Sequence, residues 1–270
     1  MVCAGTQPTL PPAARDFVPY AQSLGLLRLA AWYALELSTS TEAPFSTGTA
    51  LSHALLGRLE AVGVIRVSHS SEPGIRRSMY EPLAWLYPTD WGDPHHLQTK
   101  LQAALVELAA RQDTMDSKVE LWDALASAEI ETYVTHLLRR HALDPGGAPL
   151  IMHVMADEWA NHSLARKRYL AWYGARGASA AFLRTGMDQE AARNAMLDEM
   201  KRRARWLTSR SATGAITRDE YRFVPDPTWK RPVLLDVFLT ALLPEGKSYW
   251  SDVPPLKRDL QSKESRHRHD

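Results

Sequence analysis

The feature that most constrains the fold is a helical spacing of apolar residues from Leu97 onward. Two apolar stripes recur at the intervals that bring side chains onto one face of an α-helix. They comprise Leu97, Leu101, Leu105 and Leu108, and then Val119, Trp122, Leu125, Tyr133 and Leu137. Asp188, followed by Glu190, predicts the start of another helix over 189–208. After Pro232 the sequence VLLDVFLTALL is apolar on most sides, which is typical of a helix buried within a bundle.

The N-terminal part has a different pattern between residues 49 and 86. An apolar stripe at helical spacing comprises Leu51, Ala54, Leu55, Leu59 and Val62. Gly63 follows at the place where a helix ends, and the β-branched run 64–67 predicts a short strand. Residues 68–77 contain Ser, Pro, Gly and paired Arg, which are typical of a loop. Residues 78–86 then return as a second strand, so the expected order is helix, strand, loop and strand.

This stretch resembles the second half of a winged helix-turn-helix domain. The residues that carry the resemblance are Leu55, Leu59, Glu60, Gly63, Val64, Ile65 and the basic loop that ends at Arg76 and Arg77. In that family the helix enters the major groove of DNA, and the hairpin loop contacts phosphate. The resemblance implies that the DNA-facing residues are Thr49, Ser52, His53 and Arg58 on the helix, with Arg76 and Arg77 on the wing. Many winged helices bind protein instead, so both kinds of partner stay open.

Together these patterns predict a mainly α-helical protein with two domains. The N-terminal domain, residues 16–90, is expected to be winged-helix-like with a small β-hairpin wing, and residues 95–250 are expected to form an α-helical bundle. Residues 1–15 are rich in Pro and Ala and are expected to be flexible. Residues 251–270 are expected to be a disordered charged tail.

Composition excludes several broad classes of protein. With 270 residues, 45% of them hydrophobic, the chain has enough apolar surface for a globular core. Its one cysteine, Cys3, rules out a disulfide framework and a cysteine-based zinc site. No stretch has the apolar core of a signal peptide or the length to span a bilayer. We therefore expect a cytoplasmic protein that does not contact membranes.

Charge is unevenly distributed, although the net charge is only +1. Residues 107–131 contain 7 acidic and 2 basic residues, a balance of −5. Residues 166–210 contain 11 basic and 4 acidic residues, a balance of +7. Residues 1–80, with 6 basic and 5 acidic residues, are nearly neutral. Because phosphate contacts supply a large share of DNA affinity, the basic region is a better electrostatic footprint than the predicted wing.

The basic region also has aromatic residues between its cations, which suits a nucleic-acid surface where bases stack and Arg holds phosphate. The aromatic residues are Trp172, Tyr173, Phe182 and Trp206. The cations expected to bind are Arg166, Lys167, Arg168, Lys201, Arg202, Arg203 and Arg205. The alternative is that the acidic residues of 107–131 pair with this region, inside one bundle or across a dimer.

Other chemistry has little support in the sequence. His153 and Asp157, and likewise Glu158 and His162, are spaced to share a helix face, but the two pairs project about 100° apart. We interpret them as ion pairs and helix-end contacts, and predict no metal, no cofactor and no catalytic residue. Gly-Lys-Ser at 246–248 lacks the upstream glycine and the preceding strand of a phosphate-binding loop.

Two function hypotheses follow from the sequence. The first is a non-enzymatic protein that binds double-stranded DNA, a transcriptional regulator or an accessory factor of a bacterial mobile element or defence system. No particular residue points to that biological setting. A homodimer is compatible with it, because paired winged helices read two half-sites. The second is a protein–protein interaction subunit of a larger assembly, with the winged domain and the Trp-rich surfaces as interfaces.

Overall fold

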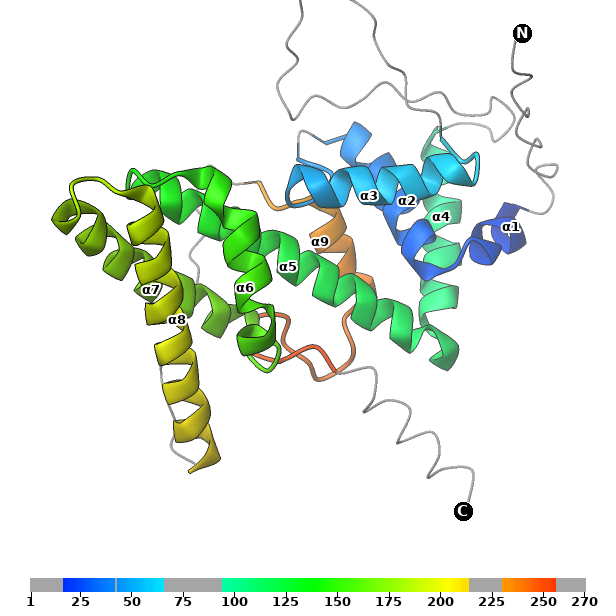
Figure 1. Cartoon of the computed structure of the whole chain (residues 1–270). Helices are drawn as coiled ribbons and strands as arrows, with labels where there is room; N and C mark the ends of the chain where they lie inside the picture. The colour runs from blue at the N-terminus through cyan, green and yellow to red at the C-terminus, as the bar shows by residue number, and fades with distance from the viewer. Residues whose placement is uncertain (1–16, 42, 66–93, 214–229, 256–270) are drawn as a thin grey trace, which may run out of the picture. The chain divides into compact units, whose positions relative to one another are not determined.

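A computed structural model describes residues 17–41, 43–65, 94–213 and 230–255 (Figure 1). Every regular element in these ranges is a helix, which confirms the mainly α-helical expectation. The helices are α1 Phe17–Ser23, α2 Leu26–Thr39, α3 Thr49–Ala61, α4 Pro94–Ala109, α5 Met115–Arg140, α6 Ala148–Trp159, α7 Leu164–Arg184, α8 Gln189–Ala212 and α9 Val233–Val237. Two short 3-10 turns, Gln112–Thr114 and Pro145–Gly147, precede α5 and α6, and a π-helical turn, Phe238–Leu242, continues α9. None of the helices described is both long and apolar enough to cross a membrane.

The expected winged-helix-like domain with a β-hairpin is wrong. The residues described contain no strand, and Val64 and Ile65, assigned to the first strand, instead close the end of α3. Gly63 adopts a φ of 70°, and the Val64 N–H donates to the Leu59 carbonyl at 3.2 Å, as in a helix C-terminal turn. Both side chains are buried, so a β-branched apolar pair here completes a helical core. The expected loop and second strand lie outside the described residues, as do Arg76 and Arg77, the N-terminus 1–15 and most of the tail 251–270.

The chain divides into two compact units. The first consists of residues 1–122 and 230–244, and the second of residues 123–229 and 245–270. The first boundary between them, after Trp122, falls within helix α5.

In the first unit, α2 is the central helix and packs on α1, α3, α4 and α9. Trp32 of α2 is fully buried, and its ring lies 5.6 Å from the ring of Phe17. Helix α9 returns here from far along the chain, and the N–H of Val233 donates to the carbonyl of Pro44 at 2.9 Å. The apolar segment after Pro232 is therefore buried, as its composition predicts.

In the second unit, α7 and α8 form an antiparallel hairpin joined by residues 185–188 (Figure 1). Asp188 caps α8, because its carboxylate accepts hydrogen bonds from the N–H groups of Glu190 and Ala191 at 2.9 and 3.1 Å. The helices approach closely at Gly174, where an added Cβ would lie 2.5 Å from Cγ of Met200. This hairpin carries most of the basic region and fixes the orientation of its side chains.

Candidate functional site

The densest group of cations lies on the C-terminal half of α8. The apolar residues Met196, Met200, Ala204 and Leu207 recur at helical spacing and are buried. That burial fixes the rotation of the helix, so Arg202 and Arg205 face outward. We call residues 201–210 the basic half of α8; its cations are Lys201, Arg202, Arg203, Arg205 and Arg210.

Arg202 and Arg205 form ion pairs at the surface and remain highly accessible. Their side chains are 70% and 71% exposed. Arg202 donates to Glu199 on the same helix at 2.5 Å, and Arg205 donates to Glu158 of α6 at 3.0 Å. The hydrogen bond and the charge of Glu199 raise the pKa of Arg202, so it is cationic at any physiological pH. Ion pairs this exposed are weak because water and salt screen them, so both guanidinium groups can exchange their carboxylate for another anion.

Arg203 lies between the two helices and is held by aromatic rings. Its Nη2 donates to the hydroxyl of Tyr169 at 2.6 Å. Its guanidinium carbon lies 3.9 Å from the ring centre of Trp206, and 5.4 and 5.3 Å from those of Tyr169 and Tyr173. A guanidinium at these distances is attracted by the π-electrons of each ring. Arg203 therefore fixes the aromatic side chains of α7 against those of α8.

The same pattern continues on both sides of Arg203. On α7 the guanidinium of Arg176 lies 4.9 Å from the ring centre of Trp172, and on α8 that of Arg210 lies 5.3 Å from Trp206. We call this surface the cation–aromatic face; it comprises Tyr169, Trp172, Tyr173, Arg176, Arg203, Trp206 and Arg210. The sequence singles out Trp172, Tyr173, Arg203 and Trp206, but not Tyr169, Arg176 or Arg210. The i,i+4 spacing of Trp172 and Arg176, and of Trp206 and Arg210, is the signal that would have found them.

The other basic cluster, at 166–168, points largely inward. Arg166 is half-buried, whereas Lys167 and Arg168 are buried. Arg168 donates to Glu129 of α5 at 2.7 Å, and its guanidinium carbon lies 4.8 Å from the ring centre of Trp250. Burial lowers the pKa of Lys167, and the charge of Asp123 opposes that change. Lys167 and Arg168 therefore lie in the interior of the second unit and do not form part of an exposed surface.

The pair Glu129–Arg168 joins the acidic block to the basic region within one unit. This is the internal pairing that the sequence left open as an alternative, and it accounts for one cation of the predicted set. Arg202 and Arg205 use other carboxylates, and both of those pairs lie at the surface. Internal neutralisation therefore explains the cluster at 166–168 better than it explains the basic half of α8.

Two of the four residues of α3 that were predicted to face DNA form side-chain interactions within the first unit. Thr49 and His53 are exposed. The hydroxyl of Ser52 is hydrogen bonded to that of Ser46 at 2.8 Å, and Arg58 pairs with Glu120 at 3.2 Å. Because Arg76 and Arg77 lie outside the described residues, the structure does not bring the predicted helix and wing contacts together.

The two acid–histidine pairs of α6 do not converge. His153 and Asp157 are exposed, Glu158 holds Arg205, and His162 is buried after the end of the helix. Within the ranges that the structure describes, no three His, Cys, Asp or Glu side chains gather closely enough to hold a metal ion.

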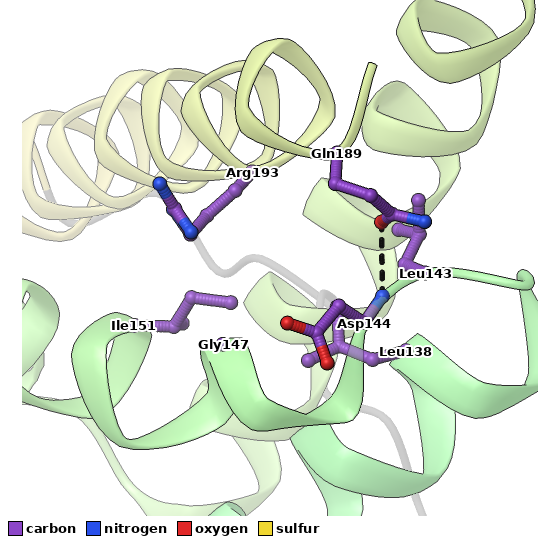
Figure 2. Close-up of a pocket in the computed structure, with 7 residues that line it drawn as sticks. All are labelled: Leu138, Leu143, Asp144, Gly147, Ile151, Gln189 and Arg193. Atoms are coloured by element: carbon purple, nitrogen blue, oxygen red, sulfur yellow. Dashed lines mark hydrogen bonds between the residues drawn. The ribbon is translucent and has the colours of Figure 1, made fainter. Parts of the chain in front are cut away.

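A small pocket in the second unit lies at the opposite end of α8 from its basic half. Gln189 and Arg193 of α8 face Asp144, Gly147 and Ile151 across it (Figure 2). The Asp144 N–H donates to the side-chain oxygen of Gln189 at 2.9 Å. The pocket volume of about 20 Å³ is enough for a single water molecule and too small for an organic ligand.

His162 gives this unit a pH-dependent stability. Burial lowers the pKa of His162 below its ordinary value of 6.5, the charges of Arg166 and Lys167 lower it further, and Glu158 opposes them. Below about pH 6.5 the unfolded chain therefore takes up a proton that the folded chain excludes. The unfolding free energy consequently decreases as the pH is lowered. We expect His162→Asn to flatten the fall in unfolding free energy between about pH 6.5 and pH 5, measured by urea denaturation. His153→Asn, the same change at an exposed position, should leave the wild-type slope; equal slopes for all three proteins would contradict this assignment.

Comparison with known proteins adds no function to this geometry. No family model, curated protein or solved structure shows a significant match to the chain.

Proposed function

We propose that this chain is a non-enzymatic nucleic-acid-binding protein, and that the basic half of α8 contacts the phosphate backbone. The observation that carries the proposal is a run of five cations in residues 200–212 with no acidic residue among them. Two of these cations, Arg202 and Arg205, extend into solvent from a helix whose apolar side is buried. A local group of exposed guanidinium groups is the electrostatic footprint of a phosphate-binding surface.

The surface ion pairs are compatible with this role. Arg202 and Arg205 are held by one carboxylate each, in pairs that solvent and salt weaken. A polyanion presents many phosphates in a row and releases condensed counterions when cations bind it, which an isolated carboxylate does not. Phosphate is therefore the stronger competitor at low salt.

The proposal is independent of the winged helix. Specific reading of duplex DNA was implied by that resemblance, and the residues described contain no strand that could form the wing. Phosphate contacts orient a protein on nucleic acid but carry no sequence information. A role as a regulator or as an accessory factor, a homodimer and a cytoplasmic location stay hypotheses that the basic half of α8 neither needs nor tests.

A second candidate function is a protein-interaction subunit, and one observation favours it. Leu183 and Met187 are exposed apolar residues at the turn between α7 and α8, and Met187 has a φ of 72°, which is uncommon for a residue other than glycine. Two exposed apolar side chains beside a turn with a positive φ offer a small apolar contact for another protein. Binding of nucleic acid that depends on α8 and not on this turn would favour the first function.

The first function predicts a defined loss of affinity when the accessible cations are removed. We expect Arg202→Gln with Arg205→Gln to weaken binding of a fluorescein-labelled oligonucleotide by roughly tenfold at about 50–100 mM salt, measured by anisotropy, because the variant no longer holds two of the phosphates. Glutamine keeps the helix propensity and most of the length of the side chain.

A matched control is available on α5. Arg139→Gln with Arg140→Gln removes the same charge from exposed positions in the last turn of α5. Asp144, a few residues further along the chain, is hydrogen bonded to Gln189 at the start of α8. At 1.5 Å per residue, Arg205 is about 24 Å further along α8 than Gln189. The control should bind as the wild type does. Equal losses of affinity in both double variants would mean that net charge alone attracts the ligand, and no binding by the wild type at low salt would exclude the proposed function.

A further inference from the structure

Trp206 is a large aromatic side chain that the fold leaves partly exposed. It is 39% exposed, whereas Trp32, Trp122 and Trp159 are buried. It belongs to the basic half of α8, with Arg203 one turn before it and Arg210 one turn after it. Apolar burial does not explain its position, because the residues of α8 that pack inward are Met196, Met200, Ala204 and Leu207.

The Trp206 ring is held in place by its neighbours. The guanidinium of Arg203 lies 3.9 Å from its centre, and Arg203 is itself fixed by a 2.6 Å hydrogen bond to the hydroxyl of Tyr169. The ring centre of Tyr173 also lies near that guanidinium, at 5.3 Å. An aromatic side chain ordered in this way loses little conformational entropy when a ligand stacks on it.

A flat exposed ring among cations fits one class of ligand better than others. Nucleobases stack on aromatic side chains regardless of their identity, and neighbouring Arg residues neutralise the phosphates that connect them. Bases of a duplex are already stacked on one another and face the helix axis. Only unpaired bases are free to stack on a side chain at a protein surface.

We infer that the cation–aromatic face binds single-stranded nucleic acid in preference to duplex, with a base stacked on Trp206. Arg202 and Arg205 hold the flanking phosphates. This inference rests on the proposed function, since it specifies the ligand of the same surface. It predicts a preference for single-stranded nucleic acid without sequence specificity. Neither stacking nor phosphate contact involves hydrogen bonds to the edges of the bases, which distinguish one sequence from another.

An anionic membrane is the other surface that a basic helix with a Trp residue can bind. Such helices insert a continuous apolar face into the lipid interface. In α8 the apolar face is already buried, and Trp206 is the only large hydrophobic residue of residues 201–210 that is exposed. The geometry therefore favours the nucleic-acid strand.

The test compares two labelled ligands and two variants of the full chain. The ligands are a deoxythymidine oligomer and a mixed-sequence duplex with the same number of phosphates. We expect the wild type to bind the single strand about tenfold more tightly than the duplex at equal salt, since one stacked base is worth roughly that factor. Trp206→Leu should lower the affinity for the single strand about tenfold and change duplex binding by less than about twofold, whereas Trp206→Phe, which keeps a ring, should retain most of the affinity.

The outcomes separate this inference from the function on which it rests. Equal affinity for both ligands, unchanged by Trp206→Leu, would overturn the single-strand preference and leave phosphate binding intact. No binding of either ligand would overturn both. Vesicles of phosphatidylserine that bind the chain more tightly than the oligomer does, in a manner that depends on Trp206, would overturn the inference in favour of a membrane. A merely structural role of Trp206 would weaken binding of both ligands equally, so the selective effect is diagnostic.

Discussion

Replacing Glu129 with alanine is expected to lower the unfolding free energy by about 3–5 kcal/mol, because it leaves the guanidinium of Arg168 buried without its carboxylate. The two side chains are 2% and 5% exposed, and they are 2.7 Å apart. Arg168 also lies against the rings of Trp250 and Tyr133, at 4.8 and 5.6 Å. Moving the guanidinium into water would therefore disrupt the packing of several elements of the second unit. Urea denaturation followed by circular dichroism measures the change in stability.

Two further variants test the cause of that destabilisation. Glu131→Ala, two residues along α5 at a half-exposed position, removes the same side chain and should change stability by less than about 0.5 kcal/mol. Replacing Glu129 and Arg168 together by methionine should recover most of the stability, because no buried charge is left unpaired. If Glu129→Ala were no more destabilising than Glu131→Ala, the buried pair would not stabilise the fold.

Substituting alanine for Gly174 is expected to lower the unfolding free energy by about 1–2 kcal/mol, even though alanine favours a helix by about 1 kcal/mol. The new Cβ would lie 2.5 Å from Cγ of Met200 and 3.0 Å from the backbone carbonyl oxygen of Met196. The carbonyl belongs to α8 and cannot move without the helix. The α7–α8 hairpin must therefore separate slightly, and the melting temperature should fall.

Gly177 supplies the matched control one turn further along α7. A Cβ there would lie 2.7 Å from Cγ of Glu199 and 3.6 Å from its Cβ. The Glu199 side chain can rotate away at the cost of its surface ion pair with Arg202, which is weak. Gly177→Ala is expected to leave stability unchanged or to raise it by up to about 1 kcal/mol through helix propensity. Similar melting temperatures for the two variants would contradict the close helix contact at Gly174.

The helices after Leu97 are predictable from sequence because one apolar stripe per helix is a strong and repeated signal. The region predicted as the wing is not predictable in this way, because the local sequence around Gly63 is compatible with two structures. A glycine with a positive φ followed by two β-branched residues can begin a strand. The same residues can equally well end a helix and pack into the core. Burial of Val64 and Ile65 beside α3 decides between them, and burial depends on the rest of the first unit.

The candidate site shows a similar limit. The sequence identifies where cations are dense, but it does not show whether each side chain points into solvent or into the core. Successive residues on a helix point about 100° apart. Arg166, Lys167 and Arg168 therefore point in different directions, and two of them enter the core. The carboxylate that decides this for Arg168 is Glu129, 39 residues away on another helix. No spacing rule within one helix identifies such a partner.

The measurement that tests the central claim most directly is the salt dependence of oligonucleotide binding by the wild type and the Arg202→Gln, Arg205→Gln variant. For the wild type we expect log K to fall linearly with log salt concentration, with a slope of several units. For the variant on a single strand, the slope should become shallower by about 0.7 for each phosphate that is no longer neutralised. A wild type that does not bind at the lowest salt, or a variant with an unchanged slope, would contradict the claim that the basic half of α8 binds the phosphate backbone.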